Sequence, residues 1–165
     1  MPLEFRNLII GYRDKSKLKE IAGPFDIEIP EKNLIAVIGK NGSGKTTLIK
    51  TIGQQLASIK GGVYLNEQSL QNKSNNQRAR LISFVYTTTL SSENMTVHEL
   101  VALGRYPFLH WYSKPSKKDA DCIKEALTFT ALEVLAETKI HELSDGQKQR
   151  AFIARALAQE TPYMV

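Results

Sequence analysis

Gly39-Lys40-Asn41-Gly42-Ser43-Gly44-Lys45-Thr46-Thr47 is the stretch that decides the fold class, because it predicts a phosphate-binding loop. Its glycines allow the backbone to curl so that successive N–H groups point at one anion. Lys45 is placed to reach the β- and γ-phosphates of a nucleotide, and the hydroxyl of Thr46 is placed to bind Mg²⁺. The sequence therefore predicts a nucleotide ligand.

The residues on either side have the order that such a loop requires. Residues 34–38 (Leu-Ile-Ala-Val-Ile) form an unbroken apolar run, which is typical of a parallel strand buried on both faces. Apolar side chains predicted to share one face of a helix follow the loop: Leu48, Ile49, Ile52 and Leu56. A glycine-rich turn between core elements is the alternative, and we favour the phosphate loop because strand and helix are both in place.

Length and composition indicate a chain that can form one domain with a substantial core. It has 165 residues, 42% of them hydrophobic, and a net charge of +5, which suits an anionic ligand but does not require nucleic acid. The single cysteine, Cys122, cannot form an intrachain disulfide and is expected to be a small buried residue. The N-terminus lacks a signal-peptide pattern and no apolar stretch is long enough to span a bilayer, so we expect a soluble cytoplasmic chain.

Strand patterns dominate the first half of the chain. Short apolar segments at residues 3–10 and 24–30 predict two strands joined by the charged connection 13–20. Residues 62–66 predict a further strand, and residues 81–85 a buried one.

Helix signals replace strand signals from Thr96 onward. Thr96 and Glu99 form a capping-box pattern before an apolar helix that Gly104 is expected to stop, and Ser116 with Asp119 opens another helix reaching about Thr130. The intervening segment contains Phe108, His110 and Trp111, and its pattern is equally compatible with packing in a helical hairpin and with a docking surface.

A second motif, Leu-Ser-Asp-Gly-Gln-Lys-Gln-Arg at residues 143–150, precedes an alanine-rich helix. Ser144 is a natural N-cap and Gln147 occupies the reciprocal capping-box position, so helix capping alone explains both residues. Combined with the phosphate loop, however, the stretch resembles the signature motif of ABC ATPases, usually Leu-Ser-Gly-Gly-Gln, with Asp145 at the variable third position.

The resemblance implies an α/β fold: a P-loop NTPase (RecA-like) core with an antiparallel β flank and an inserted α-helical subdomain, C-terminally incomplete. Residues 1–92 would form the β flank and the P-loop core, and residues 93–158 the helical subdomain with the signature motif. Residues 161–165 would begin the strand that carries the Walker B carboxylates.

The resemblance also implies ATP and Mg²⁺ as ligands, and a homodimer of nucleotide-binding subunits in which the P-loop of one faces the signature motif of the other. Catalytic roles would fall to Lys45 and Ser144, and Thr46 would bind Mg²⁺. Tyr12 lies where family members stack an aromatic ring on adenine, although a surface tyrosine on a strand is the alternative. The nucleotide-binding residues implied are Tyr12, Gly39, Asn41, Gly42, Ser43, Gly44, Lys45, Thr46, Thr47, Ser144, Gly146 and Gln147.

Residues 95–107 resemble the corresponding region of importers for iron-siderophore, haem and cobalamin. The resemblance implies that the full-length protein hydrolyses ATP to drive import of an iron-siderophore or a related chelate. It would lie on the cytoplasmic face of the membrane, bound to transmembrane permease subunits, and no nucleic acid partner is expected.

Two departures from the family pattern are visible. Thr87 stands where members usually carry a glutamine that contacts Mg²⁺, so a hydroxyl or a bridging water would replace the amide. The chain also ends at Val165, before the Walker B aspartate, the catalytic glutamate and the switch histidine, so we expect a truncated fragment that hydrolyses almost no ATP by itself.

Two alternatives from other functional classes remain open. A non-transport ABC ATPase acting on DNA or ribosomes would agree with the basic net charge. A nucleotide-sensing module that binds without hydrolysis would agree with the missing carboxylates.

Overall fold

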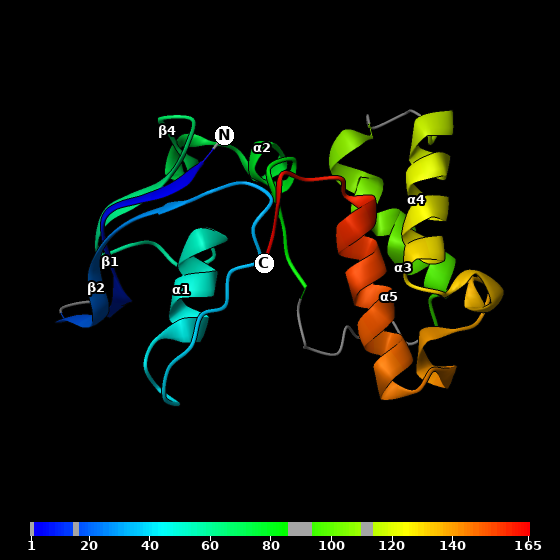
Figure 1. The fold of residues 1–165 in the computed structure, drawn as a ribbon, viewed down its shortest axis with the longest axis horizontal. Helices are drawn as coiled ribbons and strands as arrows, with labels where there is room; N and C mark the ends of the chain where they lie inside the picture. The colour runs from blue at the N-terminus through cyan, green and yellow to red at the C-terminus, as the bar shows by residue number, and fades with distance from the viewer. Residues whose placement is uncertain (1, 15–16, 86–93, 110–113) are drawn as a thin grey trace. The chain divides into compact units, whose positions relative to one another are not determined.

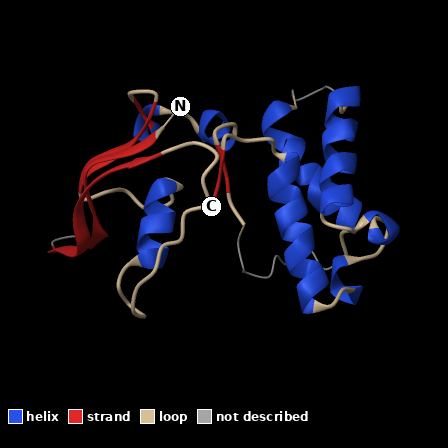
Figure 2. Ribbon diagram, in the orientation of Figure 1, coloured by secondary structure: helices blue, strands red, loops and turns tan. Residues whose placement is uncertain are grey.

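The computed structural model describes residues 2–14, 17–85, 94–109 and 114–165, which form two compact units, Met1–Arg78 and Ala79–Val165 (Figure 1). Strands dominate the first unit and helices the second (Figure 2). In the first unit the elements are β1 (Leu3–Asp14), β2 (Lys17–Ile29), α1 (Lys45–Ile52), β3 (Lys60–Leu65), β4 (Gln68–Ser69) and η1 (Leu70–Asn72). Helix α2 (Asn75–Ala79) follows, and then β5 (Ile82–Ser83), α3 (Val97–Ala102), η2 (Leu103–Phe108), α4 (Lys117–Phe129), η3 (Glu133–Leu135), η4 (Ile140–Glu142), α5 (Asp145–Ala158) and β6 (Tyr163–Met164).

The first unit is built on an antiparallel sheet in the order β2-β1-β3-β4. Buried apolar residues of β1 alternate with more exposed ones on either side of a register irregularity between Phe5 and Leu8, as a strand with one buried face requires. The buried set is Leu3, Phe5, Leu8, Ile10, Ile52, Val63, Leu65 and Leu70. The antiparallel flank is therefore confirmed, but both strands are longer than predicted, because residues 13–14 and 17–20 of the charged connection are themselves strand.

Helix α1 begins directly after the phosphate loop, as predicted, but is shorter than the apolar pattern indicated. It ends at Ile52, and the N–H of Gly53 closes its last turn on the carbonyl of Ile49 at 3.0 Å. Leu56 lies beyond this end. Gly53 has the lowest helix propensity of the residues in this segment, which explains why the helix stops there.

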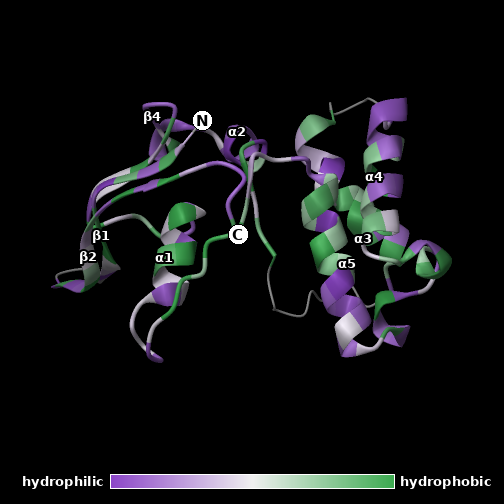
Figure 3. Ribbon diagram, in the orientation of Figure 1, coloured by the Kyte–Doolittle hydropathy of each residue, from purple (hydrophilic) through white to green (hydrophobic). Residues whose placement is uncertain are grey.

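The predicted buried strand at residues 34–38 is wrong. No described strand is hydrogen bonded to this segment, and the side chains of Leu34 and Ile38 are 102% and 91% exposed. Figure 3 shows the apolar character of the segment that leads into α1. A parallel strand exists only with hydrogen-bonded neighbours on its edges, so an apolar run without such a neighbour has neither the ladder nor the burial that defines a strand.

The second unit has a helical core in which α3, α4 and α5 pack together (Figure 1). Its buried residues are Val97, Leu100, Val101, Ile123, Ala126, Leu127, Leu132, Ile140, Leu143, Ala151, Ala154 and Ala158. The capping boxes predicted at Thr96/Glu99 and Ser116/Asp119 are both present, which confirms the two helix starts. Each satisfies backbone N–H groups that the first turn leaves without a partner.

The predicted end of the α-helix at Gly104 is confirmed, because Leu103 is its C-cap, but the chain stays helical beyond it. The α-helix ends at Ala102, and the chain continues as the 3₁₀ helix η2 through Gly104 to Phe108. A Cβ on Gly104 would lie 2.3 Å from the carbonyl oxygen of Arg155. Glycine is required here because η2 crosses α5 at backbone contact distance.

The predicted strand at residues 81–85 is present in reduced form. Only Ile82–Ser83 are strand, and they pair in parallel with Tyr163–Met164 of β6. Backbone N–H groups of Tyr163 and Val165 donate to the carbonyls of Leu81 and Ser83 at 3.3 and 2.9 Å. The division between the two units, at Arg78/Ala79, precedes the boundary at residues 92/93 that the sequence predicted for the helical subdomain.

Across the described ranges, no helix has both the length and the apolar character needed to cross a membrane.

Candidate nucleotide-binding site

The loop at residues 39–47 has the curled backbone that its glycines predict. Gly42 and Gly44 adopt φ values of +80° and +97°, a region that residues with a side chain rarely enter. Gly44 then serves as N-cap of α1, and its carbonyl accepts the N–H of Leu48 at 2.8 Å. Successive N–H groups of the loop and the first turn of α1 therefore lie at the positive end of the helix dipole, where anions are stabilised.

Gly44 also brings the loop against the β1–β2 hairpin. A Cβ at this position would lie 2.8 Å from Cγ2 of Ile21 and 3.5 Å from Cδ1 of Ile10. Any larger residue would push the loop away from the sheet, so Gly44 sets both the backbone conformation and the distance between the loop and the hairpin.

The Lys45 ammonium group lies within the loop. Its Nζ donates to the carbonyl oxygens of Gly39 at 2.7 Å and Lys40 at 2.9 Å. Two of its three N–H bonds are thus used by the loop itself, which holds the positive charge beside the curled backbone. An anion bound beside the loop would therefore lie close to this charge.

The remaining loop residues divide into exposed and buried ones. Asn41, Gly42, Ser43 and Thr46 are exposed, and the Thr46 hydroxyl is therefore accessible to a metal-nucleotide complex. Thr47 is buried, and its Oγ1 lies 3.1 Å from the hydroxyl of Tyr12 on β1. The structure thus brings Tyr12 together with the loop across a long separation in sequence.

An apolar pocket of about 560 Å³ adjoins the same loop. Residues 35–38 form one wall, facing β1 and β2, and Gly39, Ser43, Gly44 and Lys45 lie at its edge. The lining is mainly aliphatic and aromatic, so the pocket suits apolar groups and not phosphates. The apolar lining residues are Phe5, Ile10, Ala22, Phe25, Ile27, Ile29, Ile35, Ala36, Val37, Ile38 and Leu48.

In the second unit, Ser144 is the N-cap of α5, as predicted. Its Oγ accepts the N–H of Gln147 at 3.3 Å, and the Gln147 side chain accepts the N–H of Ser144 at 2.8 Å. Arg150 donates to the carbonyl of Thr130 at 3.0 Å and so fixes this end of α5 to the end of α4. Gly146 differs from the other glycines, because it has no positive φ and a Cβ there would meet no atom within 4 Å.

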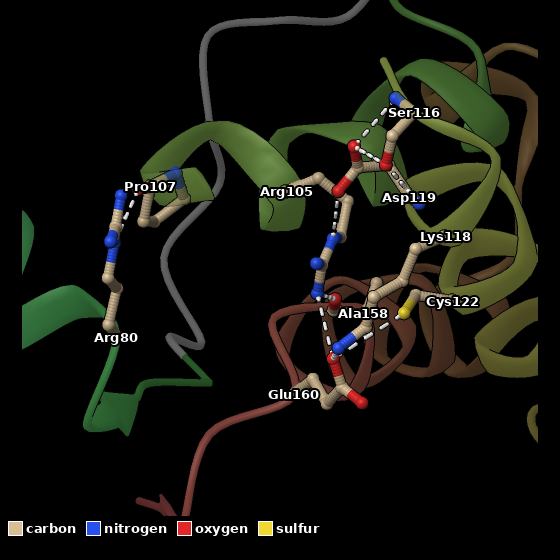
Figure 4. Close-up of polar contacts among 9 residues, drawn as sticks. All are labelled: Arg80, Arg105, Pro107, Ser116, Lys118, Asp119, Cys122, Ala158 and Glu160. Atoms are coloured by element: carbon tan, nitrogen blue, oxygen red, sulfur yellow. Dashed lines mark hydrogen bonds and ion pairs between the residues drawn. The ribbon is translucent and has the colours of Figure 1, made fainter. Parts of the chain in front are cut away.

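A buried ion pair that the sequence analysis missed organises the helical unit (Figure 4). Arg105 Nε donates to Asp119 Oδ1 at 2.9 Å, and its Nη1 donates to the Ala158 carbonyl at the end of α5 at 2.8 Å. The second oxygen of Asp119 accepts from Ser116, at 2.8 Å from the backbone N–H and 2.6 Å from the hydroxyl. One guanidinium thereby connects η2, the start of α4 and the end of α5.

The same contacts shift the titration of the carboxylate. Hydrogen bonds from Ser116, reinforced by Arg105, lower the pKa of Asp119 to about 2. The Ser116–Asp119 pair was recognised in the sequence only as a helix cap. A single arginine after a glycine gives no pattern that would indicate its burial, so local reasoning had no means of finding its partner.

Cys122 is half-buried instead of fully buried as predicted. Its Sγ lies 3.7 Å from Glu160 Oε2, and burial raises the pKa of the thiol. Glu160 also receives the Lys118 ammonium at 3.0 Å, which lowers the pKa of the carboxylate. A thiol kept protonated in this way is a poor nucleophile.

Other predicted features lie partly or wholly outside the described residues. Thr87, His110 and Trp111 are in the segments that the structure does not describe. Among the side chains that are described, no group of three His, Cys, Asp or Glu residues is arranged to hold a metal ion. Mg²⁺ binding at Thr46 stays a prediction.

The loop geometry and the signature helix agree with one family, and a comparison with known families decides the assignment. The family model described as "ABC transporter" matches residues 23–165. The chain belongs to the ABC transporter ATP-binding family. The resemblance inferred from the two motifs, and with it the P-loop NTPase fold class, is confirmed.

Individual relatives have names from the transport of small molecules. The achromobactin transport ATP-binding protein CbrD of Dickeya dadantii (strain 3937) is 36% identical over 156 residues, covering 94% of this chain and 56% of the relative. The ferric enterobactin transport ATP-binding protein FepC of Escherichia coli (strain K12) is 36% identical over 163 residues, covering 99% and 59%. The chain thus spans a little more than half the length of these curated relatives.

A solved structure agrees with the fold. An ATP-binding cassette in a dimeric post-hydrolysis state, bound to ADP and Pi, superposes with a TM-score of 0.79 at 26% identity. The match covers 98% of this chain and 72% of that one.

Proposed function

We propose that this chain binds ATP with Mg²⁺ through the loop at residues 39–47, and that the whole protein hydrolyses ATP to drive import of an iron-siderophore or a related chelate. The observation that carries the nucleotide assignment is the Lys45 ammonium, held at 2.7 and 2.9 Å by carbonyls of a loop with two left-handed glycines. The substrate class rests on the names of the relatives, which concern achromobactin and ferric enterobactin.

Each loop residue has a role that its position supports. Backbone N–H groups of Asn41 to Thr47 would bind the phosphates, with Lys45 neutralising the β- and γ-phosphates. The exposed hydroxyl of Thr46 would bind Mg²⁺, and the half-exposed ring of Tyr12 would stack on adenine.

Ser144, Gly146 and Gln147 would bind the γ-phosphate of a nucleotide held by a second copy. Gly146 is the best support for an external ligand, because no feature of the described chain requires glycine at that position. Alanine in the first turn of α5 would favour the helix by about 1 kcal/mol. Close approach of a phosphate to the backbone gives a reason for the missing side chain.

The remaining assignments concern assembly. The dimeric cassette bound to ADP and Pi supports a homodimer of nucleotide-binding subunits. The transport names of the relatives support association with transmembrane permease subunits at the cytoplasmic face of the membrane. The alternative of an ABC ATPase acting on DNA or ribosomes rests on the net charge of +5 alone.

Nucleotide binding is tested by titrating the protein with a fluorescent ATP analogue in the presence of Mg²⁺. Lys45→Ala removes a charge-assisted contact to the phosphates and should weaken binding about tenfold or more. Lys50→Ala, an exposed lysine in the last turn of the same helix, is the matched control and should bind like the unsubstituted protein. Equal affinities for the two variants would contradict the assignment.

Transport is tested in cells that lack the gene. Restoring the whole gene should restore uptake of siderophore labelled with radioactive iron, whereas the Lys45→Ala gene should not. Normal uptake without the gene, together with salt-sensitive retention of nucleic acid by the protein on filters, would instead favour the DNA or ribosome alternative. A whole protein that binds ATP but turns none over would favour the sensing module.

A further inference from the structure

A hydrogen bond joins Tyr12, the residue predicted to stack on adenine, to Thr47 in the helix that follows the phosphate loop. The two hydroxyl oxygens are 3.1 Å apart. Thr47 is only 5% exposed, whereas 46% of Tyr12 remains exposed. The bond therefore fixes the far end of the phenol while leaving much of the side chain free to be covered by a ligand.

Both residues of this hydrogen bond lie in backbone segments that are fixed by close contacts to neighbouring backbone. On the strand side, a Cβ on the neighbouring Gly11 would lie 2.1 Å from the carbonyl oxygen of Lys19, so β1 and β2 are in tight contact there. On the helix side, the Thr47 carbonyl accepts the hydroxyl of Thr51 at 2.8 Å within α1. A hydrogen bond between two such anchors restricts the orientation of the ring between them.

The hydroxyl pair is one of two close contacts between this region and the sheet. The other is Gly44, where an added Cβ would lie 2.8 Å from Cγ2 of Ile21. What the hydroxyl pair adds to that contact is a defined position for the Tyr12 ring relative to the phosphate loop.

We propose that Thr47 is a positioning residue, whose hydroxyl holds the Tyr12 ring at the distance from the phosphate loop that an adenine nucleotide requires. The inference rests on the proposed function, since it needs ATP at the loop and adenine on Tyr12. Fixing the ring before the ligand arrives lowers the conformational entropy lost on binding, and this gain applies only to ligands that carry a base.

The experiment compares binding of ATP and of inorganic tripolyphosphate, which has the phosphates but no base. Tyr12→Phe keeps the ring and removes the hydroxyl, so ATP should bind about three- to tenfold more weakly, as expected for one hydrogen bond. Tripolyphosphate affinity should not change in this variant. Tyr12→Ala should weaken ATP binding further, by about tenfold or more in total, because the stacking surface is lost.

A double-mutant cycle with Thr47 separates positioning from a general structural effect. In a Thr47→Val background, which preserves side-chain shape without the hydroxyl, Tyr12→Phe should cause no further loss of ATP affinity. In a Thr47→Ser background, which retains a hydroxyl, Tyr12→Phe should again weaken ATP binding. Tripolyphosphate affinity measures any direct contact of Thr47 with phosphate, independently of the base.

The outcomes distinguish failure of this inference from failure of the proposed function. Unchanged or tighter ATP binding by Tyr12→Phe, or equal weakening of ATP and tripolyphosphate, would overturn the positioning role while leaving the loop as a nucleotide site. Additive effects of the two substitutions would overturn it as well. If neither ligand binds the unsubstituted protein, the nucleotide assignment itself fails.

Discussion

Replacing Asp119 by Asn tests the buried ion pair that connects three elements of the helical unit. The substitution preserves the shape of the side chain and one hydrogen-bond acceptor, but removes the charge that faces Arg105 at 2.9 Å. Arg105 is then buried with the Ala158 carbonyl, the Phe108 ring at 4.3 Å and the outer contact to Glu160 at 3.6 Å to compensate its charge.

Two estimates set the range of the cost. The Asp119 pKa falls from 3.8 to about 2 on folding, which corresponds to about 2 kcal/mol of stability for the ionised form. Removing one partner of a buried pair costs about 3–5 kcal/mol, and the remaining contacts of Arg105 place this site at the low end. We therefore expect Asp119→Asn to lower the free energy of unfolding by about 2–3 kcal/mol at neutral pH.

The pH dependence has a definite sign. Because folding lowers the pKa of Asp119, its contribution is fully present above the ordinary value of 3.8 and is lost as the pH falls toward about 2. The difference in stability between the original protein and Asp119→Asn should therefore shrink over this interval. Taking the difference removes the effect of other carboxylates, which titrate in both proteins.

Hydrogen exchange followed by mass spectrometry, together with urea unfolding, measures this cost. Peptides from the start of α4 and the end of α5 should lose protection together, because Arg105 connects both. Asp121→Asn, an exposed carboxylate on the same helix, is the matched control. A change below about 0.5 kcal/mol for Asp119→Asn, or a stability difference that does not depend on pH, would refute the reasoning.

Four further substitutions test three glycines and the cap of α5. Gly44→Ala should cost about 2 kcal/mol or more and weaken ATP binding, because φ is +97° and the new Cβ would contact Ile21; unchanged urea unfolding would contradict this. Gly104→Ala should destabilise the helical unit by about 2 kcal/mol or more through its clash with α5, measured by thermal unfolding, and a wild-type melting temperature would count against the close crossing. Ser144→Ala should cost about 1 kcal/mol as a lost N-cap, whereas Gly146→Ala should not lower stability but should abolish ATP turnover by the whole protein. Hydrogen exchange at α5 and an ATPase assay separate these last two, and full turnover by Gly146→Ala would remove the support for a phosphate there.

The parts of the fold that could be predicted from the sequence are those determined by residues close together in the chain. The phosphate loop, the hairpin and the capping boxes at Thr96, Ser116 and Ser144 depend on residues a few positions apart, and the structure contains each. Residues 34–38 were misjudged because a strand depends on neighbours that are distant in the sequence. The packing constraint on Gly104 was missed for the same reason, since it comes from the Arg155 backbone.

In the candidate site, too, features with local causes were predicted and contacts between distant residues were not. Pattern alone predicted the positions of the loop residues, whereas the Tyr12–Thr47 bond and the Arg105–Asp119 pair join residues of different elements. Neither pair has a sequence spacing that marks it, because side chains from separate elements meet only after packing. The roles assigned to individual site residues stay predictions until the variants above are measured.

The apolar run at residues 34–38 has a practical consequence for handling the protein. Its side chains are exposed and no described strand pairs with its backbone. The segment therefore presents an exposed apolar surface, and its backbone N–H and C=O groups are open to pairing with another chain. Two molecules that meet along this segment bury apolar side chains and gain backbone hydrogen bonds at once. We therefore expect concentrated solutions of residues 1–165 to self-associate, and dilute samples are the proper starting point for every binding measurement described above.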